Sequence, residues 1–152
     1  MYEPDRQEFE DFVRKIEPGL RRAFFAALGV QHGRDATAEA LAWAWENWPK
    51  VKDMTNPTGY LFRVGQSQSR KKRVRPVFVR DDWHEPLVEP QLGRVLADLS
   101  EAQRTAVILV YAFGWTLSEV AALNGTKVTS VQTHLERGLR KLRLAMGVEE
   151  RA

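Results

Sequence analysis

Apolar residues recur at intervals of three and four along most of this chain, which is the spacing of one buried face on an α-helix. The longest stripe runs through the last third of the chain: Val128, Val131, Leu135, Leu139 and Leu142. Breaks in the pattern divide the chain into two helical parts. We therefore predict an all-α fold, with two small helical domains joined by a linker.

Two short amphipathic patterns precede residue 30, one on each side of Pro18. The apolar positions are Phe9, Phe12, Val13 and Ile16 before it and Leu20, Phe24, Ala27 and Leu28 after it. Proline lacks a backbone N–H and clashes with the preceding helical turn. We expect Pro18 and Gly19 to break or kink the helix here.

Two more helices are expected before residue 76. An alanine-rich segment from 35 to 48 favours a helix that Pro49 ends. Asn56 as the capping residue and Pro57 at the first helical position predict the start of the next helix. We expect it to bury Tyr60, Leu61 and Val64 and then to continue into a polar, strongly basic stretch.

Prolines and acidic residues interrupt the helical pattern from 76 to 93, which predicts an irregular linker. Helical signals resume near Arg94. Ser100 and Gln103 have the spacing of a capping box, and Gly114 is a candidate stop signal. The predicted domains are therefore 1–75 and 94–152, on either side of the linker.

The second domain ends in a helix-turn-helix pattern. Thr116 and Glu119 can form another capping box, which predicts a short helix from Leu117. In that helix we expect Val120 and Leu123 to face inward, and Ala121 to be small where the next helix crosses. Gly125 tolerates the positive φ that a tight turn between the two helices requires.

The second helix of this motif has a polar and basic face opposite its apolar stripe. In helix-turn-helix proteins the start of this helix enters the major groove of DNA. We predict duplex contacts by Lys127, Thr129, Ser130, Gln132, Thr133, His134, Arg137, Arg140 and Lys141. Arg137 and Arg140 are candidate phosphate contacts, and Lys127, Ser130 and Thr133 are candidates for base edges. The alternative is an amphipathic hairpin with a solvated charged face.

Composition agrees with an intracellular nucleic-acid-binding protein. The net charge is +3, there is no cysteine, and no apolar run is long enough to span a bilayer. We expect a cytoplasmic location. His32, His84 and His134 are far apart, and no phosphate-binding loop is present. We therefore expect no enzyme activity, no metal site and no cofactor.

The order of parts resembles bacterial sigma factors of the extracytoplasmic-function group, within the sigma-seventy family. These proteins have a helical module that ends in a basic helix, a linker, and a helix-turn-helix domain that opens like Leu99-Ser-Glu-Ala-Gln-Arg here. The resemblance is strongest from Leu99 to Arg143. It rests there on Leu99, Gln103, Arg104, Glu119, Ala121, Gly125, Val131, Leu135, Leu139, Leu142 and Arg143.

The resemblance implies a role for each half. The first would bind core RNA polymerase through Asp35, Glu39 and Trp43. It would hold the melted minus-ten promoter strand with Lys50, Lys52, Asn56, Arg63, Arg70, Lys71 and Arg73. The second half would read the duplex minus-thirty-five element. The implied partners are core RNA polymerase, promoter DNA and, in some members, an anti-sigma factor.

Two other functions fit the same residues. One is a stand-alone helix-turn-helix regulator that binds DNA as a dimer. The other is a sigma-like interaction module that binds polymerase or a regulator without initiating. Gln66-Ser67 favours the module, because the family usually has Arg-Asn there. For Trp43, Trp45 and Trp48 we favour packing over base stacking, and we expect Trp115 in the core.

Overall fold

The computed structural model describes residues 3–72 and 90–147, and all regular structure in these ranges is helical. The first half contains α1 (Glu3–Leu28), α2 (Val30–Glu46), α3 (Trp48–Val51) and α4 (Pro57–Lys71). The second half contains α5 (Pro90–Asp98), α6 (Glu101–Val107), a π-helical segment η2 (Ile108–Ala112), α7 (Leu117–Asn124) and α8 (Val128–Ala145). The all-α prediction is confirmed.

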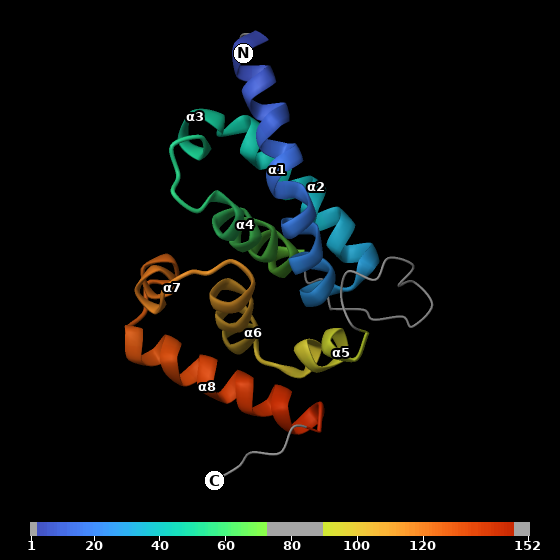
Figure 1. The fold of residues 1–152 in the computed structure, drawn as a ribbon, viewed down its shortest axis with the longest axis vertical. Helices are drawn as coiled ribbons and strands as arrows, with labels where there is room; N and C mark the ends of the chain where they lie inside the picture. The colour runs from blue at the N-terminus through green and yellow to red at the C-terminus, as the bar shows by residue number, and fades with distance from the viewer. Residues whose placement is uncertain (1–2, 73–89, 148–152) are drawn as a thin grey trace.

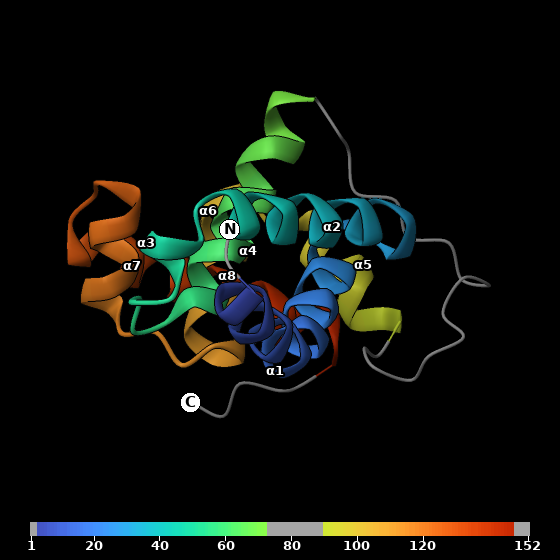
Figure 2. The same cartoon turned by 90° about the horizontal axis from the view of Figure 1, so that it is seen from above.

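The two halves are stacked along the long axis of the molecule (Figure 1). The N-terminal end of α1 lies at one extreme and α8 at the other. Seen from above, helices α1, α2 and α4 of the first half lie over the second half (Figure 2). Buried residues of both halves pack together where they meet.

Helix α1 is continuous through Pro18, so the helix does not break there as one of the two predicted outcomes had it. Ile16, Leu20 and Phe24, on both sides of the proline, are buried in one core. Burying each of these side chains contributes about 1.5–3 kcal/mol. Their sum exceeds the cost of about 3 kcal/mol for a proline inside a helix.

The boundaries of α2 and α3 also differ from prediction. Helix α2 starts at Val30 rather than near residue 35, and it ends at Glu46. Pro49 does not end a helix, because it occupies the first turn of the short helix α3. Proline is accepted in a first turn, where its missing N–H has no helical partner to lose.

Asn56 caps α4 as predicted, and its side chain accepts a hydrogen bond from the Gly59 N–H at 3.4 Å. The buried face differs from the predicted one by a fraction of a turn. Leu61 and Phe62 are fully buried, whereas Tyr60 and Val64 are half-buried. This rotation turns the later positions Gln66 and Ser69 toward the interior.

The second half begins at Pro90, so the last four residues of the predicted linker are helical. Residues 76–89 lie outside the described ranges. Both predicted capping boxes are present, at Ser100–Gln103 and at Thr116–Glu119. Gly125 ends α7 with φ of 66°, in the left-handed region that favours glycine. The helix-turn-helix is confirmed.

The larger hydrophobic core includes residues of both halves. It joins Phe24, Leu61 and Phe62 to Leu109 and Trp115. Trp115 is 8% exposed, which confirms its predicted place in the core. A smaller cluster joins Ala26 of α1 to α5, α6 and α8.

We call the contact between α4 and the second half the seam. It is formed by Asn56, Gly59, Phe62, Arg63, Gln66 and Arg70 of the α4 region and by Glu101, Thr105, Phe113 and Trp115 opposite. Gly59 packs so closely on the indole that a Cβ there would lie 2.3 Å from Trp115 Nε1. Asn56 donates a hydrogen bond to the Phe113 carbonyl at 3.4 Å. Arrangements that keep this seam intact are called closed below.

Candidate nucleic-acid interface

Helix α8 presents the predicted duplex-binding residues on an open face. Val131 and Leu142 are buried, and Leu135 and Leu139 are half-buried, so the stripe anchors the helix. Val128 is 41% exposed, which corrects its predicted burial, because it stands at the first turn beyond the reach of the core. The opposite face is left to solvent.

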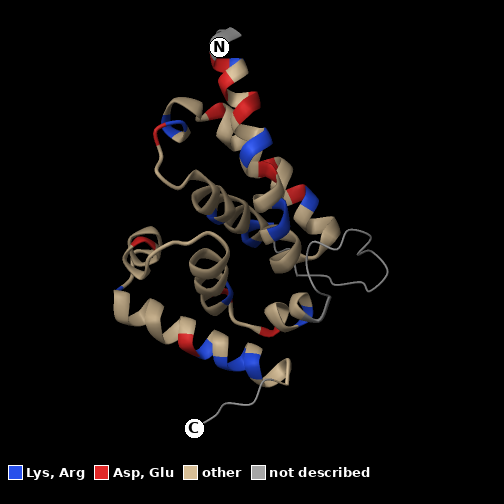
Figure 3. Ribbon diagram, viewed as in Figure 1, with Lys and Arg blue, Asp and Glu red and all other residues tan. Residues whose placement is uncertain are grey.

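Most of the predicted duplex contacts lie on that exposed face. Lys127, Thr129, Gln132, Thr133, Arg137, Arg140 and Lys141 are exposed, and Ser130 and His134 are half-buried. Figure 3 shows the basic residues gathered in the C-terminal part of α8. Lys127 precedes the helix without capping it through its side chain. The first turn is therefore polar and largely uncharged, and the later turns are cationic.

Three of these side chains already have partners within the protein. Thr133 donates its hydroxyl hydrogen to the Thr129 carbonyl at 3.0 Å, so its oxygen remains available as an acceptor. Gln132 donates to Glu136 at 3.4 Å. Lys141 donates to Gln103 of α6 at 3.0 Å and so points toward the body of the domain.

The α4 face that carries Arg63 and Arg70 is engaged across the seam. Arg63 donates to Gln66 Oε1 at 2.9 Å and to Glu101 Oε1 at 3.3 Å. Arg70 donates to the same Glu101 oxygen at 2.9 Å. These residues border a cleft of about 340 Å³, whose far wall includes Asn124 and His134.

The other predicted melted-strand residues are spread over the same half. Lys50 lies over the rings of Trp43 and Tyr60, with Nζ 5.9 and 5.5 Å from the two centroids. Lys52 and Lys71 are exposed. Asn56 caps α4, as described above, and Arg73 lies outside the described residues.

The predicted polymerase-binding residues follow one another at four-residue intervals along α2. Asp35 is exposed, and Glu39 is half-buried and forms an ion pair with Lys72 at the end of α4. Trp43 is half-buried and stacks in tilted contact with Tyr60, 5.7 Å between centroids. The tryptophans of this region differ in exposure, since Trp48 is buried and Trp45 is 36% exposed.

Sequence reasoning missed the role of Glu101. Its helix was predicted through Ser100, but nothing in the local pattern indicates that Glu101 meets two arginines more than 30 positions away. Burial lowers the pKa of the Arg104 guanidinium, and the charge of Glu101 partly offsets that effect. Glu101 therefore lies in the field of three arginines.

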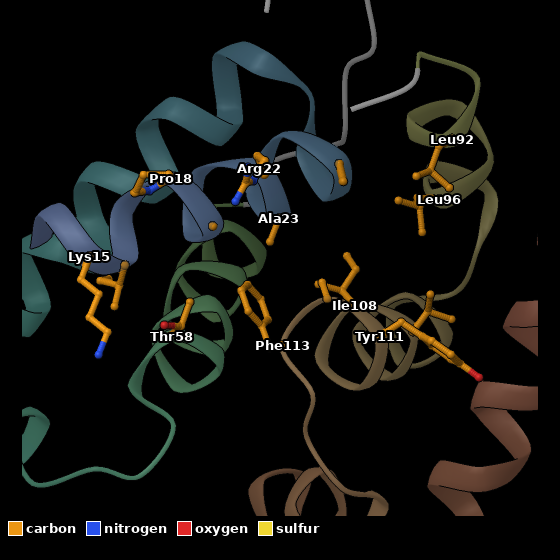
Figure 4. Close-up of a pocket in the computed structure, with 15 residues that line it drawn as sticks. Lys15, Pro18, Arg22, Ala23, Thr58, Leu92, Leu96, Ile108, Tyr111 and Phe113 are labelled. Carbon is orange, nitrogen blue, oxygen red and sulfur yellow. The ribbon is translucent and has the colours of Figure 1, made fainter. Parts of the chain in front are cut away.

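A second hollow, of about 690 Å³, lies on another side of the junction between the halves. Its walls come from α1, α4, α5, α6 and η2, and we call it the groove. Figure 4 shows Leu92, Leu96 and Ile108 facing the space opposite Ala23, with Lys15 and Arg22 nearby. These two cations are its charged lining residues.

Within the described ranges, no group of three or more His, Cys, Asp or Glu side chains is placed to hold a metal ion. In the same ranges, no helix is both long and apolar enough to cross a membrane.

Residues 90–142 match the family described as Sigma-70, region 4. No curated protein sequence matches the chain. Among solved structures, the fold is similar to that of the sigma factor RpoE from Bartonella quintana, solved in complex with the anti-sigma factor NepR. The two chains share 21% identity with a TM-score of 0.76, over 95% of this chain and 99% of RpoE.

The family match covers α5 to α8, including both capping boxes and the exposed face of α8. The fold similarity extends the likeness over the first half. Both findings agree with the sigma-factor resemblance seen in the sequence. The second half therefore matches Sigma-70, region 4, and the whole chain has a fold similar to that of a sigma factor.

Proposed function

We propose that the two halves divide promoter recognition as the resemblance implies. The second half docks α8 in the major groove of the upstream, minus-thirty-five element. Arg137 and Arg140 contact phosphates there, and Lys127, Ser130 and Thr133 face base edges. The first half binds core polymerase through the Asp35, Glu39 and Trp43 face of α2. It holds the melted strand with α4 and the Lys50–Asn56 loop.

One observation carries this proposal: the region 4 match ends on a helix whose polar and basic face is exposed. Phosphate contacts supply most of the affinity of such an interface, and base-edge contacts supply the sequence preference. The mechanism is recruitment and strand capture, without any bond chemistry by this chain.

The test is transcription in vitro with purified protein, core RNA polymerase and fragmented host genomic DNA, followed by mapping of RNA starts. We expect discrete starts that share an upstream sequence. Arg137→Ala should reduce their yield, while Asp35→Ala should reduce binding to core polymerase. Co-elution with polymerase without any new start would contradict the assignment of strand capture to the first half.

We also propose that an anti-sigma factor is a partner of this chain and that it occupies the groove. The RpoE complex supports the partner class, and the apolar lining with Lys15 and Arg22 supports the site. The occupant that fits best is an amphipathic helix with acidic residues beside its apolar face. Because both halves form the groove, such a partner would stabilise the closed arrangement.

A further inference from the structure

The seam holds a polar network as well as apolar contacts. Thr105 donates its hydroxyl hydrogen to Gln66 Oε1 at 2.8 Å, and these residues are 1% and 4% exposed. The same Gln66 oxygen accepts from Arg63. This buried hydrogen bond across the seam favours the closed arrangement modestly, because opening exchanges it for hydrogen bonds to water.

Glu101 extends this network toward solvent. Arg63, Gln66 and Arg70 lie at i, i+3 and i+7 on α4, so all three share one face of that helix. The carboxylate of Glu101 approaches that face and receives a hydrogen bond from both guanidinium groups. The side chains of Arg63 and Glu101 are 22% and 35% exposed, so water screens their attraction only in part.

A carboxylate held by two arginines has the chemistry of a bound phosphate. Guanidinium groups bind both anions through the same N–H donors, and both bonds are strengthened by charge. Glu101 takes up an NH1 group of each arginine. A nucleic-acid phosphate could use those donors only after Glu101 has left.

The distance between the two promoter elements requires Glu101 to separate from Arg63 and Arg70. This step rests on the proposed function. Elements about 25 base pairs apart are separated by about 85 Å along duplex DNA. A compact chain of this length has a radius of gyration of only about 15 Å. The halves must therefore separate for α4 and α8 to reach both elements at once.

We propose that Glu101 is an internal phosphate mimic that couples closure of the seam to occlusion of the single-strand site. In the closed arrangement it neutralises Arg63 and Arg70. In the open arrangement both arginines are released to bind the melted strand. DNA and Glu101 then compete for the same cations, so single-stranded DNA favours opening and closure weakens single-strand binding by the same factor.

The test compares Glu101→Gln with Asp98→Asn, a matched loss of one negative charge three residues earlier. Asp98 is exposed and makes no ion pair with Arg63 or Arg70 among the described residues. The chain has no cysteine, so dyes can be placed on cysteines introduced at Arg34 of α2 and Arg143 of α8. Energy transfer between them reports closure, and a short fluorescein-labelled single-stranded oligonucleotide reports binding.

We expect Glu101→Gln to lower energy transfer and to tighten oligonucleotide binding about three- to tenfold. Asp98→Asn should change binding less than about twofold, through its long-range charge alone. The gain from Glu101→Gln should vanish when Arg63 and Arg70 are both glutamine. Equal effects of Glu101→Gln and Asp98→Asn on both measurements would overturn the proposal.

A second variant keeps the proposal testable if Glu101→Gln does not fold. Thr105→Val removes the hydroxyl donor to Gln66 while leaving every charge in place. It should also lower energy transfer, with a smaller gain in oligonucleotide binding because Glu101 still competes. If the Arg63→Gln, Arg70→Gln protein binds the oligonucleotide as tightly as wild type, the strand-capture role fails. Energy transfer still decides whether Glu101 holds the seam closed.

Discussion

Helices α4 and α8 both carry arginines at helical spacing, but their surroundings differ. On α8 the exposed Arg137 and Arg140 face solvent, next to a polar first turn. On α4 the arginines are paired with Glu101, and a buried glutamine beside them bonds to the other half. One candidate nucleic-acid surface is therefore ready for a ligand, and the other is occupied.

This difference indicates an order of events. In the proposed division of roles, duplex binding by α8 would need no rearrangement of the halves, whereas capture of a single strand by Arg63 and Arg70 would require the seam to open. A closed factor would then find upstream duplex DNA while holding its single-strand site neutral. The free energy of seam opening sets how strongly the two activities are separated.

The largest effect should come from Gly59→Ala, which disrupts the packing of α4 on the second half at the seam. A methyl group there would overlap the indole of Trp115, at 2.3 Å from Nε1. We expect a loss of about 1–3 kcal/mol in the free energy of unfolding, measured with urea. Gly19→Ala in α1 is the control, because its methyl group would meet no atom within 4 Å. It should instead stabilise by about 0.5–1 kcal/mol.

Unchanged stability of Gly59→Ala would show that Gly59 and Trp115 are not in contact in solution. The closed arrangement would then be a minor state, and the contrast between α4 and α8 would disappear.

A smaller effect should follow from Arg137→Ala or Arg140→Ala, which test the exposed face of α8. Each removes one expected phosphate contact, so binding to every duplex sequence should weaken. The slope of log K against log salt should fall by about 0.9 for each variant. Arg14→Ala, at an exposed position of α1, carries the same charge change as a control. If the salt slopes equal that of wild type, Arg137 and Arg140 do not contact DNA phosphates.

The smallest effect on stability should come from replacing Tyr111 with a photo-reactive benzoyl-phenylalanine. Tyr111 is 64% exposed at the edge of the groove, so the unfolding free energy should change by less than about 0.5 kcal/mol. On irradiation in the host we expect a cross-link to one small acidic protein. The same group at the exposed Gln7 should give no such product. Adducts to polymerase subunits alone would assign the groove to a different partner.

Local signals predicted the elements of this fold well wherever a short stretch of sequence determines the structure. Ser100, Thr116, Asn56 and Gly125 cap or end helices as expected, because a cap is decided by residues within one turn. The local rule failed at Pro18, where core packing on both sides of the proline outweighed a missing hydrogen bond. Val128 shows the opposite limit, since it follows the apolar spacing and yet lies exposed.

The candidate site was predictable in one half and hidden in the other. On α8 the polar face follows from periodicity alone, so the exposed residues could be named in advance. On α4 the same reasoning named Arg63 and Arg70 but not their neighbour Glu101, which comes from a helix on the far side of the linker. Gln66, which departs from the family pattern, has a structural role across the seam.

The amino-acid sequence by itself determined the helices, their caps, the turn at Gly125 and the polar face of α8, because these depend on spacing and on contacts within a few residues. Only the tertiary structure decided that the halves share a core, that the Trp115 indole packs against Gly59, and that Glu101 pairs with two arginines. Such contacts join residues far apart in the chain. Their free energy depends on how well two surfaces pack together, and the local spacing of apolar residues does not determine that packing.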